Sequence, residues 1–90
     1  MKYKINWDNA VIFRGIPKII AWKDEEDAYL IEPSTEEEEQ ALLRLINRIY
    51  DLADDDGVFD IEPSELDILE KELFEELLEH KIFLKIGDKT

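Results

Sequence analysis

The sequence contains no cysteine, and its 90 residues include only three glycines, three prolines and one histidine. The missing cysteines exclude disulfides and thiolate metal sites, and they fit a reducing compartment. Three scattered glycines do not form a glycine-rich phosphate loop. A Ser–His–Asp device would depend on His80 alone, and that residue follows a predicted helix, where a histidine interacts favourably with the helix C-terminus. We therefore expect a protein without enzymatic activity, cofactor or catalytic residues.

The sequence also lacks a long apolar run. The N-terminal stretch MKYKINWDNAVIFRG has no unbroken apolar core of signal-peptide length, and no other stretch would span a bilayer. We expect a soluble protein of the cytoplasm, or of the host cytoplasm if it is viral. The length allows one small acidic domain, residues 1–90, and so short a chain buries only about 60% of its unfolded surface. A homodimer would add stability and stays open as an alternative.

Positive charge is scarce. The chain has 11 Lys and Arg against 24 Asp and Glu, which gives a net charge of −13. Most of the acids lie between residues 23 and 79, while both ends are mildly basic. Such a surface repels nucleic acid and anionic membranes and attracts basic partners. We therefore expect no direct binding to nucleic acid or membrane, and a basic protein as partner, in particular a nucleic-acid-binding protein or a nuclease.

Alternating hydrophobicity predicts strands in the first third of the chain. In KYKINW, Tyr3, Ile5 and Trp7 share one face, as in a half-buried strand. The following Asp8-Asn9 fits a two-residue hairpin turn into a second strand, AVIFR. GIP then interrupts the pattern, and KIIAW and AYLIE are predicted as third and fourth strands on either side of the charged loop KDEED.

Helical spacing begins after the fourth predicted strand. A first amphipathic helix is predicted from Thr35 to Ala53, and Ser34 with Glu37 has the spacing of a capping box. Its inward positions are Leu42, Leu45, Ile46, Ile49, Leu52 and Ala53. A second helix is predicted from about Ser64, as its cap, to His80. Its inner stripe comprises Leu66, Leu69, Leu73 and Leu77.

The end of the chain alternates again. KIFLKI predicts a closing strand with Ile82, Leu84 and Ile86 on its inner face, followed by the tail GDKT. The order of elements therefore predicts an α+β fold with an N-terminal antiparallel sheet of three or four strands. Two amphipathic helices would pack on this sheet, and a short C-terminal strand would return to it.

An aspartate-rich segment separates the two predicted helices. ADDDGVFDIEPSEL resembles EF-hand-like calcium loops and the helix-loop-helix turn of tellurite-resistance-type domains. With Gly57 at the sixth loop position, Asp54 and Asp56 occupy the third and fifth ligand positions. Leu52 and Pro63 stand where the first and last ligands belong. We therefore favour a simple connection in which the glycine makes the turn and the aspartates are solvated.

A weak divalent-cation site remains the alternative for this segment. Its candidate ligands are Asp54, Asp56 and Asp60. A divalent-cation-binding helix-loop-helix protein is accordingly kept among the alternative functions.

The second predicted helix carries an acidic stripe opposite its leucines. The stripe consists of Glu65, Glu72, Glu76 and Glu79. Neighbours three or four residues apart on a helix lie about 5–6 Å from each other, which is close to the roughly 6–7 Å between successive phosphates of a DNA strand. Ile68 falls within the acidic arc, where an apolar residue would serve as an anchor for a protein partner. The alternative is an ordinary solvated helix face.

In size and charge the chain resembles phage-encoded DNA mimics such as anti-CRISPR and anti-restriction proteins. The resemblance implies a non-enzymatic inhibitor that blocks the nucleic-acid-binding surface of a basic protein. The partner-binding residues would be Asp54, Asp55, Asp56, Glu65, Ile68, Glu72, Glu76 and Glu79. The alternatives are an immunity protein or antitoxin that neutralises a basic nuclease toxin, and an adaptor without mimicry.

Overall fold

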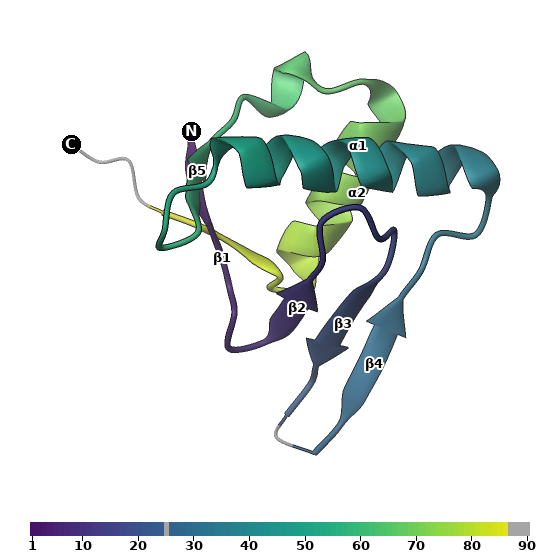
Figure 1. Cartoon of the computed structure of the whole chain (residues 1–90), viewed down its shortest axis with the longest axis vertical. Helices are drawn as coiled ribbons and strands as arrows, with labels where there is room; N and C mark the ends of the chain where they lie inside the picture. Colours follow the sequence, from purple (N-terminus) through teal and green to yellow (C-terminus); the bar gives the residue numbers. More distant parts are fainter. Residues whose placement is uncertain (25, 87–90) are drawn as a thin grey trace.

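The computed structural model describes residues 1–24 and 26–86, which form two helices and two three-stranded antiparallel sheets (Figure 1). The strands are β1 (Lys2–Ile5), β2 (Ala10–Ile12), β3 (Ile19–Trp22), β4 (Ala28–Ile31), β5 (Val58–Asp60) and β6 (Phe83–Lys85). The helices are α1 (Glu36–Leu52), α2 (Ile68–Glu79) and the short 3-10 helix η1 (Pro63–Glu65). The α+β prediction is confirmed. The predicted tail GDKT lies outside the described residues.

Sheet A has the order β5-β1-β6, so the first strand is the central one. Tyr3 lies opposite Phe59 on β5 and Lys85 on β6. The strand β5 was not predicted, because its three residues follow a turn and show no complete alternation. The connection between the predicted helices therefore contains a strand that pairs with the N-terminal strand of the chain.

The predicted hairpin at Asp8-Asn9 is wrong, because β1 and β2 belong to different sheets. Asn6 redirects the chain: its backbone N–H donates to Ile82 O (2.9 Å) and its side-chain amide donates to Lys81 O (3.0 Å). The backbone N–H groups of Asn9 and Ala10 then both donate to Asn6 O. This tight turn passes the chain from sheet A into sheet B.

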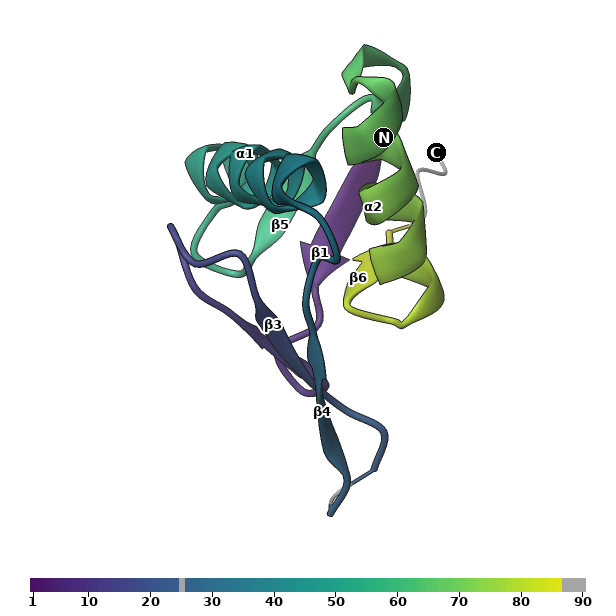
Figure 2. The same ribbon diagram turned by 90° about the vertical axis from the view of Figure 1, so that its right-hand side faces the viewer.

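Sheet B has the order β2-β3-β4. Its inner face is fully buried and consists of Ala10, Ile12, Ile19 and Ala21. Its outer face carries a row of aliphatic residues, since Val11 pairs with Ile20 and Ile20 with Leu30. Figure 2 shows β3 and β4 extending away from the two helices, and on this outer face Val11 and Ile20 are half-buried while Leu30 is 49% exposed.

The cap of the first helix lies one residue later than predicted, at Thr35. Thr35 Oγ1 accepts a hydrogen bond from the backbone N–H of Glu38 (3.1 Å), and Glu38 Oε1 accepts one from the N–H of Ser34 (2.9 Å). The capping box predicted for Ser34 and Glu37 is therefore wrong: the cap is Thr35, and the glutamate that returns a hydrogen bond binds the N–H of the residue before the cap. The buried positions of α1 are Ala41, Leu42, Leu45, Ile46 and Ile49. Leu52, predicted to face inward, is 46% exposed.

The second helix begins at Ile68 and not at Ser64, because the intervening residues form η1. Asp67 is the N-cap: its Oδ1 accepts from the backbone N–H of Glu70 (2.8 Å), and Glu70 Oε1 accepts from the N–H of Asp67 (3.4 Å). The later start leaves Leu66 before the helix, although it is buried as predicted. The buried residues of α2 itself are Phe74 and Leu77, while Leu69 and Leu73 are half-buried.

Helix α2 ends in a Schellman motif. Lys81 adopts a left-handed φ of 65°, its N–H donates to Leu78 O (3.1 Å), and the N–H of Ile82 donates to Leu77 O (2.9 Å). The turn changes the phase of the final strand. Phe83 is buried and Leu84 is 38% exposed, so the predicted inner face of the closing strand is wrong at residue 84.

One hydrophobic cluster joins the helices and both sheets. Its centre is a set of aromatic rings, in which Tyr3 meets Phe74 edge-on with centroids 5.0 Å apart and Phe59 meets Phe83 edge-on at 5.4 Å. Trp7 was predicted on the same inner face as Tyr3, but it lies beyond the end of β1 and is 45% exposed. No helix among the described residues is long and apolar enough to cross a membrane.

Candidate functional site

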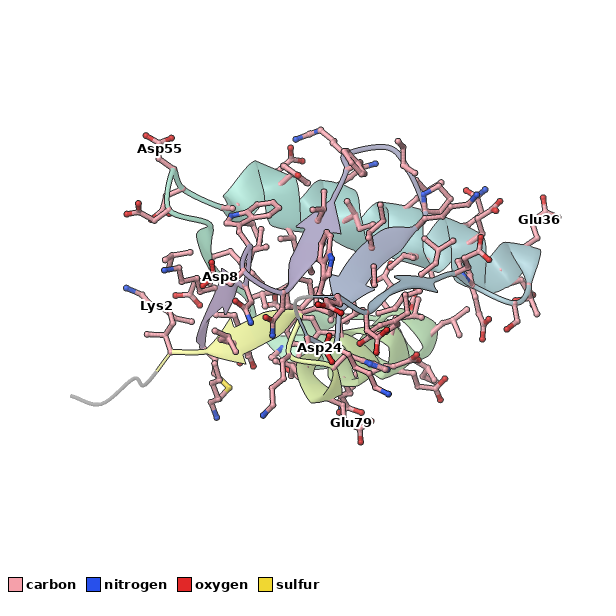
Figure 3. The ribbon with its side chains drawn as sticks, turned by 90° about the horizontal axis from the view of Figure 1, so that it is seen from below. Lys2, Asp8, Asp24, Glu36, Asp55 and Glu79 are labelled. Carbon is pink, nitrogen blue, oxygen red and sulfur yellow. The ribbon has the colours of Figure 1, made fainter. Side chains whose placement is uncertain are left out.

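Four exposed carboxylates form an array on α2. Glu72, Glu75, Glu76 and Glu79 all border one shallow surface depression together with His80. Because they are related by steps of three and four residues, neighbouring members lie about 5–6 Å apart at their Cβ atoms. None of the four makes an ion pair with a basic group in the described part of the chain. Glu79 projects outward from the helix (Figure 3).

The array differs from the stripe predicted from the sequence. Glu65 belongs to η1 and not to α2, and its Oε1 lies 3.4 Å from Nη2 of Arg48 on α1. The predicted stripe therefore loses its first member to an ion pair between elements. Glu75 was not predicted as a member, although its spacing of three residues from Glu72 indicates it.

Ile68 is the most exposed large apolar residue of the described chain, at 80%. It is the first residue of α2, and Glu72 and Glu76 follow it at four-residue intervals, so all three lie along one side of the helix. Its placement among acidic residues agrees with the sequence prediction. An exposed isoleucine beside unpaired carboxylates has the composition of a protein-binding surface.

A groove of about 790 Å³ runs between the first turns of α1 and the start of α2, with Ile68 and Leu69 on one side and Glu36 and Glu37 on the other. Arg44 crosses it from α1. Its Nε donates to Glu70 Oε2 (2.7 Å) and its Nη2 to Asp67 Oδ2 (3.2 Å).

The hydrogen bond to Glu70, helped by the charges of Glu70 and Asp67, raises the pKa of Arg44 above its ordinary value. The arginine thus pairs with both acids of the α2 cap, and the carboxylates without an ion pair among the described residues lie further along the helix.

The aspartate loop is stabilised by one of its own carboxylates. Asp54 Oδ1 accepts hydrogen bonds from the backbone N–H groups of Asp56 (2.9 Å) and Val58 (3.0 Å). Gly57 has a φ of 81°, as the predicted turn requires. Asp55 points away from the body of the protein (Figure 3). This loop does not continue the array of α2, since it joins α1 to β5.

The structure does not gather the candidate cation ligands. Asp54 Oδ1 already accepts hydrogen bonds from the loop backbone. Asp60 Oδ1 accepts one from the N-terminal ammonium group (3.0 Å), which also donates to Glu62 Oε2 (3.0 Å). Hydrogen bonds to these two carboxylates raise the pKa of the amine. Within the described residues, no three Asp, Glu or His side chains are grouped so that they could hold a metal ion.

His80 contacts a residue of sheet B. Its Nδ1 lies 3.0 Å from the hydroxyl of Tyr29 on β4, and the two rings are 5.8 Å apart. The histidine is also the C-cap of α2, as its predicted role requires. The pair links the end of the acidic helix to the edge of sheet B.

Both tryptophans lie at one surface pocket that the sequence did not reveal. Trp7 follows β1 and Trp22 ends β3, and the pocket between them is also lined by Asp8 and Asp24. This arrangement was not predicted, because the alternation in KYKINW placed Trp7 on the buried face of a strand that leads into a hairpin.

No protein-family model, curated protein or solved structure significantly matches this chain. The surfaces are therefore interpreted from their own chemistry.

Proposed function

We propose that this chain is a non-enzymatic acidic binding protein that blocks the nucleic-acid-binding surface of a basic protein. The observation that supports it best is the array of Glu72, Glu75, Glu76 and Glu79 on α2, which is exposed and has no basic partner among the described residues. Carboxylates at this spacing can replace successive phosphates at the Lys and Arg side chains of a nucleic-acid groove.

The proposed mechanism is competition. The net charge of −13 steers the chain toward a basic groove, so that association is fast at low salt and slows as salt screens the field. Ile68 then enters an apolar recess of the partner beside the groove, which adds specificity that charge alone lacks. The partner's nucleic acid cannot occupy the same surface.

The proposal places the protein in the cytoplasm, where it would meet such a target. If the target is a nuclease toxin, the same competition makes this chain an immunity protein or antitoxin. The structure gives less support to the cation-binding alternative, because the candidate ligands Asp54 and Asp60 are engaged with the loop backbone and the N-terminal amine.

The experiment begins with affinity capture of the partner and then measures displacement of labelled duplex DNA from it. The variant Glu72→Lys/Glu76→Lys should weaken displacement about tenfold or more, because each reversal removes an attraction and adds a repulsion of up to about 1 kcal/mol. The control is Lys2→Glu/Lys4→Glu, which reverses two charges of the opposite sign on the exposed side of β1. Circular dichroism confirms folding of both.

The control should displace DNA as well as the parent does, and the α2 variant should not. If the α2 variant binds like the parent while the β1 variant loses binding, sheet A is the interface and the proposed mimicry is wrong. A partner that binds this chain and DNA simultaneously would equally exclude competition.

A further inference from the structure

Two indole rings and two carboxylates surround one pocket of about 460 Å³. Its six lining residues are Trp7, Asp8, Asn9, Val11, Trp22 and Asp24. They come from the turn after β1, the outer face of β2 and the end of β3. This part of the protein is at the lower end in Figure 1 and faces the viewer in Figure 3, where Asp8 and Asp24 are labelled. We call it the indole pocket.

Backbone hydrogen bonds connect the segments that line the pocket. The N–H of Trp22 donates to Asn9 O (2.8 Å), which ties the end of β3 to the turn that carries Trp7 and Asp8. Asp24 Oδ1 accepts from the N–H groups of Glu26 (2.9 Å) and Asp27 (3.0 Å), so its carboxylate is held in place. The backbone on both sides of the pocket and the carboxylate of Asp24 are thus fixed in position.

The charges at the pocket are uncompensated by the described residues. Neither Asp8 nor Asp24 has an ion-pair partner there. The one cation–π contact within the described chain joins Arg14 to Tyr50, away from both indoles. Trp7 is 45% exposed, although tryptophan side chains are on average highly buried. The pocket therefore brings two indole rings and uncompensated negative charge together.

We propose that the indole pocket binds the guanidinium group of an arginine side chain. Tryptophan is the best aromatic partner for a cation, and arginine is the cation that most often stacks on aromatic faces. A planar guanidinium can stack on an indole while its edge donates to a carboxylate, whereas an ammonium group acts as a point charge. The pair of carboxylates excludes an anionic ligand.

This inference deepens the proposed function, because it names the side chain by which a basic partner is held. The arginine would come from the same partner that the acidic helix contacts. The pocket lies near β1 and β3 rather than on α2, so each surface can be tested while the other stays intact.

The test uses a tetra-arginine peptide, with tetralysine and tetracitrulline as comparison probes. Citrulline keeps the shape of arginine and lacks its charge. The chain has only two tryptophans and both line the pocket, so intrinsic fluorescence detects binding there, and Trp22 separates it from the neighbouring depression that Trp7 and Asp8 border with Asp55 and Asp56. We expect a saturable change with tetra-arginine, a weaker one with tetralysine and none with tetracitrulline. Equal binding of tetralysine, or no binding of tetra-arginine, would overturn the assignment.

Variants separate the pocket from the general negative field and are compared by calorimetry. Trp22→Leu should weaken tetra-arginine binding roughly threefold to thirtyfold, the range expected for one cation–π contact. Asp8→Asn/Asp24→Asn should also weaken it, while the asparagine can still accept the backbone hydrogen bonds at position 24. The control Glu36→Gln/Glu39→Gln removes the same charge from the first turn of α1, and Glu36 lies far from Asp8 in Figure 3.

The control should bind within about twofold of the parent. If it loses as much affinity as the Asp8→Asn/Asp24→Asn variant, binding follows net charge and the pocket assignment is wrong. If Trp22→Leu binds like the parent, the indoles take no part and the assignment is equally wrong. The variant Glu72→Lys/Glu76→Lys keeps the pocket, so a failure of the proposed α2 interface would leave tetra-arginine binding measurable.

Discussion

Replacing Gly57 by alanine should destabilise the fold and displace Trp7. Gly57 has a φ of 81°, and an added Cβ would lie 3.0 Å from Trp7 Nε1 and 3.5 Å from Ile5 Cβ. The left-handed backbone costs an alanine about 1–2 kcal/mol, and the stiffer unfolded chain offsets about 0.4–1 kcal/mol of this. The close contact adds about 1 kcal/mol, because the half-exposed indole can move aside instead of compressing the core.

Gly15 provides the matched control. It also has a φ of 81°, but an added Cβ would meet nothing within 4 Å. In urea unfolding, Gly15→Ala should therefore lower the free energy of unfolding only by the cost of the left-handed backbone. Gly57→Ala should lower it by about 1 kcal/mol more. Gly57→Ala should also shift the tryptophan emission of the folded protein. Equal losses of stability in the two variants, with unchanged emission, would show that Trp7 does not pack on this turn.

Three further predictions address ionisation, the exposed anchor and the aspartate loop. Burial, with the charge of Glu62 in support, raises the pKa of Tyr3 above its ordinary value of 10.0. The folded state therefore holds this proton more tightly, so the associated stability is complete below pH 10 and is lost as the pH rises through the raised pKa. Tyr3→Phe should show a smaller loss of unfolding free energy between pH 9 and pH 11 than the parent, and an equal loss would contradict the burial argument. Ile68→Asp should change stability by less than about 0.5 kcal/mol, because the side chain is 80% exposed, but should speed dissociation from the partner in surface-binding kinetics. Unchanged dissociation would remove Ile68 from the interface. Millimolar calcium should leave the melting temperature nearly unchanged, and a saturable heat of binding that disappears in Asp54→Asn/Asp56→Asn would revive the cation site.

The periodic parts of the sequence were sufficient to predict both α-helices and the other strands, but not β5 or η1. Alternation located β1 through β4, and three- and four-residue spacing located both helices to within a few residues. The α+β class followed from their order. The exposure of Ile68 could also be predicted, because its position on the helix relative to the leucines follows from spacing alone.

The pairing of strands that are distant in the sequence could not be predicted, and neither could the residue that caps α2. The separation of β1 from β2 depends on Asn6, whose amide and N–H bind Lys81 and Ile82 at the other end of the chain. Helix α2 is capped by Asp67 and not by Ser64, because the side chains of Asp67 and Glu70 form a capping box. The indole pocket could not be predicted either, because the wrongly predicted hairpin at Asp8-Asn9 placed Trp7 on the inner face of a strand.

The central position of β1 in sheet A has a consequence for synthesis on the ribosome. Its partners are β5 and β6, which are both made after it, and its second neighbour is complete only when residues 83–85 have been made. Until β5 forms, both edges of β1 can pair with strands of other nascent chains, and until β6 forms one edge still can. Lys2 and Lys4 alternate with the buried residues Tyr3 and Ile5, and charges in such positions oppose aggregation of a waiting strand. The two lysines of β1 thus reduce its tendency to aggregate until β5 and β6 cover its edges.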